Sequence, residues 1–457
     1  MKKITTLITL SYLLSSSAFA TTLPEALVYT YQNSPELTAE REKLKVVDEK
    51  MFKAISGFLP KITYQAKKTN QKQDTATQNA PSSQQKKIDD WQDTKAKTSS
   101  FNLQQNLFNG GQDIMAVRIA KYSIEAGRAD LLSKEQEILL KAINAYLEVI
   151  KTREMLEISK ENFQAYEKKY QAIKDKVEVG AAKKADLADA VSRRANSETN
   201  LIIATGRHST AIASYIQIIG LEPENVMPCA NLSVPPANQV ELLQKSLEGN
   251  PQLKNVELQK KIADINVISS AAELLPNVNI GGSIGKNWQD TRGSNINQPY
   301  TNTKAVYISV DVPIYQQGVE YSNIRGNRAQ AAQYKYTLKN TKAVVTQGAT
   351  QSWTEYVSTQ DGVKSAKEAV TAATVALEAK QQEYNEGVGT LTELLDAQEN
   401  LFQYRLKLAQ VTQDAQVSYY KMASFMGKLN AKDLGLETKI YNVSENYDKI
   451  KFELIGL

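Results

Sequence analysis

A long internal repeat constrains this chain more than any other feature. Two pairs of prolines, each in a similar local sequence, are separated by 216 residues: Pro35 and Pro251, and Pro60 and Pro276. Further along, QNLFNGGQ and VPIYQQGV are 207 residues apart, as are Gly180 and Gly387. The difference must arise between residues 60 and 108. Because the change in length is confined to one place, we expect two structural copies that differ mainly in one loop.

Each copy begins with a helical pattern and then changes to an alternating one. We expect an opening helix of about 25 to 30 residues from Leu23 or Val240, stopped by Pro60 or Pro276, because the residue before proline avoids the α region. After each proline, apolar residues fall at every second position. We expect strands at 61–69, 98–107, 277–286 and 304–314. Each has about nine to eleven residues, the length that a tilted membrane strand needs.

Very long helices follow the strands. Gly110, Gly111 and Gly318 mark the return to helix, and 112–176 and 319–386 carry helical patterns. The first would be ~95 Å long. Elbows are expected at 177–183 and 387–390. A seam of residues spaced by three and four predicts coiled-coil packing on both sides of the second elbow. The seam consists of Val363, Ala366, Val370, Ala373, Leu377 and Tyr384, then Leu391, Leu394, Gln398, Leu401, Arg405, Leu408, Thr412, Ala415, Tyr419 and Met422.

The N-terminus and the composition restrict the class of protein. Residues 1–20, MKKITTLITLSYLLSSSAFA, combine two lysines, an apolar core and a small-x-small end. They predict a signal peptide cut before Thr21. A short membrane anchor is the alternative, but the core is shorter than the ~20 residues of a span. A mean hydropathy of -0.42 and 23% charged residues exclude a helical membrane protein.

The sequence gives little support for a disulfide, nucleic-acid binding, a metal site or catalysis. Cys229 is the only cysteine, which excludes an internal disulfide and a lipidated mature N-terminus. The net charge of +5 is too small and dispersed to indicate nucleic acid. His208 is the only histidine, so a serine triad or a His-rich metal site is poorly supported. We expect no enzyme activity, no metal and no cofactor.

The strands and helices together predict an oligomer. Four strands cannot close a barrel, and an open sheet edge is not tolerated in lipid. Strands from several chains must combine, and three chains would give twelve, an even number within the range of outer-membrane barrels. The helices would continue this wall as a tube, with their polar face lining the bore.

At this point the chain resembles a known family, the TolC-type outer-membrane efflux proteins, along its whole mature length. The resemblance rests on the duplicated order of helix, strand hairpin, long helix, elbow and helix. It also rests on seven motifs in order: LPEALVYTYQNSPEL, GFLPKI, QNLFNGG, VEVGAAKKADLADA, LLPNV, VPIYQQG and YNEGVGTLTELLDAQENL.

The resemblance implies a mainly α protein with membrane β-strands. As a homotrimer it would form a 12-stranded outer-membrane β-barrel continued by a 12-helix periplasmic α-barrel. The repeats would be 21–219 and 239–427, with an equatorial region from 220–238 and 428–457. The implied function is the exit duct of a tripartite efflux or type I secretion system. The implied partners are outer-membrane lipid, a periplasmic adaptor protein and an inner-membrane pump of the ABC, RND or MFS type.

The resemblance also assigns roles to individual residues near the two elbows. Glu393 and Asp396 lie three apart on one helix face and would form the acidic constriction, where six carboxylates of a trimer would favour cations and raise some of their own pKa values. Asp186 and Tyr384 would form the closed-state latch. The adaptor would dock on the elbows at Gly180, Ala181, Gly387 and Val388. Gly389 stands where a member of the family has an arginine, so one charged latch is missing.

Simpler interpretations stay open at this stage. Glu393 and Asp396 could form an ordinary solvated helix face, Asp186 could cap its own helix, and Tyr384 could serve packing alone. The alternative for the whole chain is a secreted or periplasmic coiled-coil structural or adaptor protein without a pore. Such a protein would share the signal peptide and the long helices, but it would gain little from two hairpins of membrane-spanning length.

Overall fold

The computed structural model describes residues 22–74, 91–228, 235–291, 300–451 and 453. The expected signal peptide, Cys229 and the middle of both hairpin links lie outside the described residues. The elements of the first repeat are α1 (Leu23–Asn33), α2 (Pro35–Ile55), β1 (Lys61–Asp74), β2 (Trp91–Asn109), α3 (Gln112–Glu178) and α4 (Lys184–Ile219). Those of the second are α5 (Gln239–Gly249), α6 (Pro251–Ala272), β3 (Asn277–Thr291), β4 (Tyr300–Asp311), α7 (Val319–Asn385) and α8 (Leu391–Phe425), and α9 (Glu445–Ile450) follows.

The chain divides into two compact units, and neither coincides with one repeat. The helical unit comprises residues 1–44, 128–255 and 339–442, and the strand unit comprises 45–127, 256–338 and 443–457. Each unit therefore takes segments from both repeats. The predicted repeats follow one another along the chain, whereas each packed unit combines corresponding segments of both repeats.

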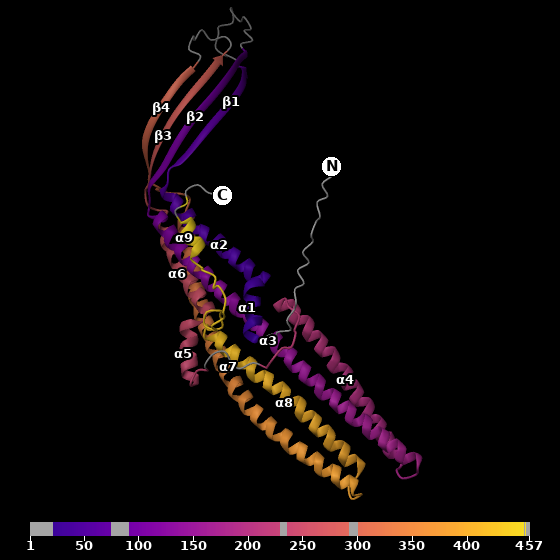
Figure 1. Cartoon of the computed structure of the whole chain (residues 1–457). Helices are drawn as coiled ribbons and strands as arrows, with labels where there is room; N and C mark the ends of the chain where they lie inside the picture. Colours follow the sequence, from indigo (N-terminus) through magenta and orange to yellow (C-terminus); the bar gives the residue numbers. More distant parts are fainter. Residues whose placement is uncertain (1–21, 75–90, 229–234, 292–299, 452, 454–457) are drawn as a thin grey trace, which may run out of the picture. The chain divides into compact units, whose positions relative to one another are not determined.

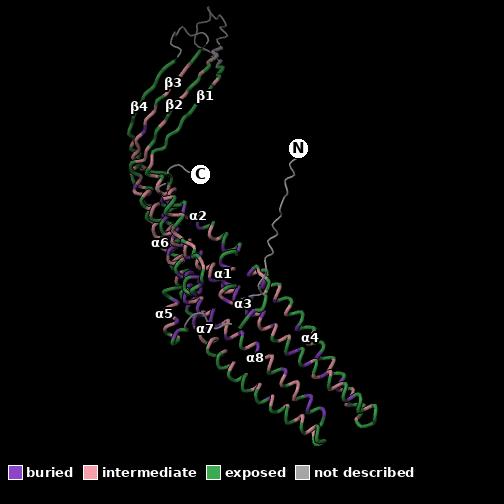
Figure 2. Tube along the Cα trace, viewed as in Figure 1, coloured by how far each residue is buried: buried purple, intermediate pink, exposed green. Residues whose placement is uncertain are grey.

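The strand unit is built around one antiparallel sheet of order β1-β2-β3-β4 (Figure 1). Because directly paired residues point to the same side, the register separates the sheet into two faces. One face is mainly apolar and carries Ile62, Tyr64, Phe101, Leu103, Ile280, Ile284, Val306, Ile308 and Val310, with Lys304 opposite Ile284. The opposite face carries Thr63, Gln65, Asn102, Gln104, Asn279, Ser283, Thr303 and Ser309. Most of the described strand residues are exposed to solvent in the single chain (Figure 2).

The strands differ in length from those expected at 61–69, 98–107, 277–286 and 304–314. All four extend further toward the hairpin links, because polar residues such as Lys72 pair in the ladder as well as apolar ones do. The prediction for β4 was wrong at its end. The strand stops at Asp311, since Pro313 has no N–H to donate to the ladder.

The single opening helix expected in each copy is two helices. Ser34 and Asn250 are extended, with ψ of 121° and 120°, and each is followed by a proline at the start of the next helix. A proline favours an extended residue before it and fits the first turn after it. The Asn250 Oδ1 accepts from the Leu253 amide at 3.1 Å. The second helices also end at Ile55 and Ala272, earlier than Pro60 and Pro276.

The predicted boundary residues lie between elements. Pro60 and Pro276 immediately precede β1 and β3, Gly110 and Gly111 separate β2 from α3, and Gly318 precedes α7. The three glycines have positive φ values of 69°, 86° and 82°. The Gly110 position is also tight, because an added Cβ would lie 2.5 Å from the Ala272 carbonyl oxygen. None of the helices within the described ranges combines the length and apolar character that crossing a membrane requires.

In the helical unit, α8 packs along α3. Phe402 and Ala409 of α8 are buried against Ile158 of α3. This core follows positions adjacent to the predicted seam: Phe402 and Ala409 are buried, whereas Leu401 and Leu408 are only partly so. Thr412 is exposed, so the seam prediction was wrong there. Burial agrees with the predicted seam before and after this stretch, at Leu391, Leu394, Ala415, Tyr419 and Met422.

Candidate functional site

The two elbows that join α3 to α4 and α7 to α8 share one backbone motif. Gly180 and Gly387 each have φ of 75°, in the left-handed region. The Ala181 amide donates to the Lys176 carbonyl at 2.7 Å, and the Val388 amide donates to the Glu383 carbonyl at 3.0 Å. The Gly180 amide also donates to the Val177 carbonyl at 3.1 Å, and the Gly387 amide to the Tyr384 carbonyl at 3.2 Å. Both elbows therefore form a Schellman C-cap.

The elbow tips expose apolar side chains. Val179 is 79% exposed and Val388 is 78% exposed. In a Schellman motif the residue after the glycine often packs back on its helix, but Val388 does not. An added Cβ at Gly389 would lie 3.0 Å from the Glu383 Cβ. A larger residue there would therefore crowd the end of α7.

The requirement for glycine gives a testable effect on stability. We expect Gly180→Ala to destabilise the purified protein by about 1–2 kcal/mol, because a Cβ disfavours the left-handed region by that amount. Gly206→Ala is the matched control. Gly206 lies within α4, has open space around its Cα and should stabilise by about 0.5–1 kcal/mol on substitution. Denaturant midpoints followed by helical circular dichroism measure both. Equal midpoints for the two variants would contradict this account of the elbow.

The helices that follow the elbows begin with acids at equivalent positions. Asp186 and Glu393 are 207 residues apart, like the elbow glycines. The Asp186 carboxylate accepts from the Lys183 amide at 3.2 Å and so caps its own helix. At the other elbow, the Thr390 hydroxyl accepts from the Glu393 amide at 3.3 Å. The Glu393 carboxylate lies instead beside Lys380 of α7.

Glu393 and Asp396 both have cationic partners. A Glu393 carboxylate oxygen lies 3.3 Å from the Lys380 Nζ. An Asp396 carboxylate oxygen lies 2.6 Å from an Arg193 Nη, which joins α8 to α4. All of these side chains keep part of their surface in solvent, so each pair contributes little to stability by itself. The sequence analysis missed both cations, because Arg193 is 203 residues from its partner and nothing in the local pattern links them.

The predicted latch residues are not joined to each other. Tyr384 packs against a cluster of Tyr166, Ile173, Ala190, Leu391 and Leu395. The Lys176 ammonium lies 5.0 Å from the centre of the Tyr384 ring. No hydrogen bond between Asp186 and Tyr384 is present within the described part of the chain, and Asp186 serves as a cap.

Polar side chains join α3 to α8 beside this cluster. The Tyr166 hydroxyl donates to the Leu395 carbonyl at 3.1 Å, and burial raises its pKa. The Lys169 Nζ donates to the Gln398 Oε1 at 3.3 Å. Burial lowers the pKa of Lys169 from 10.5 to about 8.

The lowered lysine pKa predicts a dependence of stability on pH. Between pH 8 and 10.5 the unfolded chain binds more protons at Lys169 than the folded chain does. The free energy of unfolding should therefore rise with pH across that interval. We expect Lys169→Met to reduce this rise, whereas Lys168→Met, at the exposed neighbour, should leave it unchanged. Thermal unfolding across this pH range measures the slope, and parallel curves for the wild type and Lys169→Met would refute the assignment.

A groove of about 510 Å³ lies between α7 and α8 and contains both predicted constriction acids. Its wall is unusually rich in alanine: Ala369, Ala372, Ala373, Ala376 and Ala397. Glu393, Asp396 and Tyr404 also line it. Small side chains keep the groove open and allow a third helix to approach closely.

The described residues offer little for metal or acid–base chemistry. They contain no cluster of three His, Cys, Asp or Glu side chains that could hold a metal ion. The His208 Nδ1 lies 3.1 Å from the Thr152 hydroxyl. Burial and, secondarily, Arg153 lower the pKa of His208, so the imidazole is neutral at pH 7.

Comparison with known proteins identifies the architecture. The family model described as outer membrane efflux protein matches residues 27–221 and 242–428, one segment for each repeat. The chain belongs to the outer membrane efflux protein family. This membership supports the channel interpretation over the coiled-coil alternative and gives the outer membrane as the location.

Relatives and solved structures match over nearly the whole length. The outer membrane efflux protein BepC of Brucella suis biovar 1 is 26% identical over 446 residues, which cover 97% of this chain and 94% of BepC. The outer membrane protein TolC of Vibrio cholerae is 20% identical, covering 92% and 94%. The Campylobacter jejuni CmeC outer membrane channel has a TM-score of 0.77 at 15% identity, covering 95% of this chain and 90% of CmeC. The fold of this efflux protein is thus that of the known outer-membrane channels.

Proposed function

We propose that three copies of this efflux protein assemble into one outer-membrane duct. The observation that carries the proposal is the sheet of four strands with one apolar and one polar face. In the described residues, β1 and β4 each have one free edge. Lipid does not tolerate such edges, and three sheets joined edge to edge would close a barrel of twelve strands with its apolar face outward. The alanine-lined groove supports the same assembly, because it gives a neighbouring helix room to pack.

The duct works with two other proteins. Outer membrane components of efflux and secretion systems imply an adaptor and an inner-membrane pump as partners. We propose that the adaptor docks on the elbows, at Gly180, Ala181, Gly387 and Val388. The exposed Val179 and Val388 support this docking, since apolar side chains at a tip gain by leaving water. A relative in Pseudomonas aeruginosa is named for alkaline protease secretion and another for pyoverdine export. Because both cargo types occur among the relatives, we assign the choice of cargo to the pump.

The duct carries out no catalysis and needs no cofactor in this proposal. Its control point would be the constriction formed by Glu393 and Asp396 from three chains. The pairing of Asp396 with Arg193 supports a gate, since it joins α8 to α4. Separating α8 from α4 would break this ion pair. The latch of Asp186 and Tyr384 then belongs to a state in which Asp186 has left its capping position.

The assembly and the pore can be tested on the purified, detergent-extracted protein. Its mass should correspond to three chains, and in a planar bilayer it should form small cation-selective channels. A trivalent cation added from the periplasmic side should block them, because three positive charges interact strongly with six carboxylates. A soluble monomer without conductance would overturn the proposal.

A further inference from the structure

The apolar face of the sheet ends in a group of lysines and aromatic rings. Four residues occupy one row across the strands: Lys68, Lys97, Trp288 and Tyr300. Lys286 lies on the same face, two residues before Trp288. The register thus places three cationic side chains from three strands directly beyond the apolar residues, on the side of the hairpin links.

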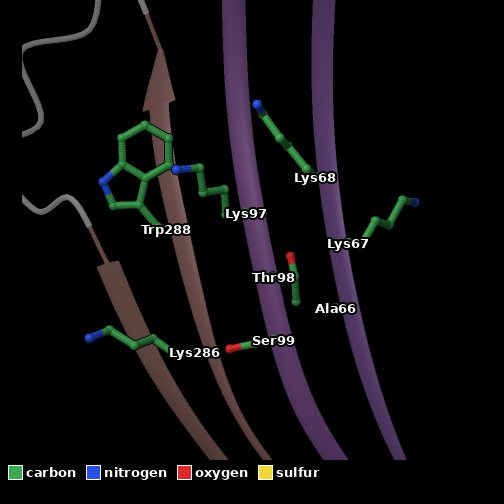
Figure 3. Close-up of a pocket in the computed structure, with 8 residues that line it drawn as sticks. All are labelled: Ala66, Lys67, Lys68, Lys97, Thr98, Ser99, Lys286 and Trp288. Atoms are coloured by element: carbon green, nitrogen blue, oxygen red, sulfur yellow. The ribbon is translucent and has the colours of Figure 1, made fainter.

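These residues surround a pocket of about 420 Å³ (Figure 3). Lys68, Lys97, Lys286 and Trp288 line it, and Lys67 diverges from Lys68 in the view. The Lys97 ammonium lies 5.3 Å from the centre of the Trp288 ring. The Lys286 ammonium lies 4.5 Å from the centre of the Tyr300 ring. The rings therefore hold two of the ammonium groups at the pocket.

The three lysines lack anionic partners of their own. No carboxylate forms an ion pair with Lys68, Lys97 or Lys286 in the parts of the chain that the structure describes. The next carboxylate on this face by register is that of Asp290, which is opposite Lys95. Three uncompensated positive charges beside one pocket favour an anion with several oxygens, and phosphate groups fit this requirement.

The residues next to the pocket indicate which kind of molecule would carry the phosphate. The apolar positions of this face run along β3 from Val278 to Ile284, and Lys286 is the ninth residue counted from Val278. A tilted membrane strand crosses the hydrocarbon core in about nine to eleven residues, which places Lys286 at the level of the headgroups. A ligand whose phosphate occupies the pocket would therefore lay its acyl chains over Phe101 and Ile284, which are exposed on the same face. Trp and Tyr prefer this boundary between apolar core and headgroups.

We propose that this pocket binds the phosphate of an anionic lipid headgroup in the outer leaflet, with the acyl chains on the adjoining apolar face. The proposal relies on the outward orientation of that face, which is part of the proposed function. The lysines act as charged contacts, and Trp288 and Tyr300 fix their positions. The lipid would stabilise the sheet at the level of the headgroups.

Native mass spectrometry of the purified, delipidated protein tests the site. The probe is lipid A, a bisphosphorylated and acylated disaccharide, compared with its dephosphorylated form and with inorganic phosphate. We expect the Lys68→Gln/Lys97→Gln/Lys286→Gln variant to bind lipid A at least tenfold more weakly than the wild type. The matched control is Lys61→Gln, which removes a lysine from the polar face of the same sheet, outside the pocket, and should bind as the wild type does.

The dephosphorylated lipid and inorganic phosphate separate the contribution of the phosphate from that of the acyl chains. Dephosphorylated lipid should bind the wild type as weakly as lipid A binds the triple variant, and inorganic phosphate should not displace lipid A. Equal binding of lipid A to the wild type and the triple variant would overturn the proposal. Binding of inorganic phosphate with the same affinity as lipid A would also overturn it, because the apolar face would then contribute nothing. Conductance of the triple variant, measured in parallel, distinguishes failure of this site from failure of the channel.

Discussion

We expect the Glu393→Ala/Asp396→Ala double variant to resist block by a trivalent cation, with a half-blocking concentration at least tenfold above that of the wild type. In the proposed trimer the substitution removes six carboxylates from one ring. A tenfold change corresponds to only about 1.4 kcal/mol, which is small beside the interaction of a trivalent ion with several carboxylates. Single-channel recordings over a range of cation concentrations measure the effect.

The ion pairs at this site provide a second variant with the opposite expectation. Lys380 and Arg193 partly neutralise the two acids, so Lys380→Ala/Arg193→Ala should lower the half-blocking concentration. Asp361→Ala/Glu368→Ala, at exposed positions earlier in α7, is the matched control for removal of two negative charges. Equal sensitivity to the cation in the wild type and the Glu393→Ala/Asp396→Ala variant would show that these residues do not form the constriction.

We expect Phe402→Ala to cause a large loss in the free energy of unfolding. The ring is 3% exposed and lies in the cluster that joins α8 to α3. Truncating a buried phenylalanine costs about 3–5 kcal/mol, because the apolar contacts are lost and a cavity remains. Denaturant midpoints at a fixed protein concentration measure the loss.

Lys407→Ala is the control for this substitution. Lys407 is exposed on the same helix, and its truncation should change the free energy of unfolding by no more than about 0.5 kcal/mol. A loss below about 1 kcal/mol for Phe402→Ala would mean that α8 and α3 do not depend on this cluster for their association.

Much of the fold could be predicted from the periodicity of the apolar residues and from the positions of glycine and proline. Two strands in each repeat, the long helices and the turns at Gly180 and Gly387 could be predicted, because alternation, unbroken helical patterns and glycine each have a local physical meaning. The breaks at Ser34 and Asn250 could also have been found, since each precedes a proline. The seam predicted the burial of Leu391 and Tyr419 but did not include Phe402, the buried residue next to Leu401.

The candidate site was less accessible to such reasoning. The positions of Glu393 and Asp396 came from a family resemblance, and their partners depend on distances between helices. Arg193 and Lys380 stand in ordinary charged helical sequence, and only packing brings them to the acids. The lysines at the end of the sheet were equally hidden, because Lys68, Lys97 and Lys286 come from three strands and share a face only through the register.

The equivalent positions of Asp186 and Glu393 bear on how a duplicated protein diverges. In the first copy the acid is needed to hold the start of its own helix. In the second, the Thr390 hydroxyl accepts from the Glu393 amide, and the Glu393 carboxylate lies beside Lys380 of the preceding helix. The same position thus serves the start of its own helix in one copy and a contact between two helices in the other. Duplicated elbows with the same backbone motif therefore present different charges and contacts at equivalent positions.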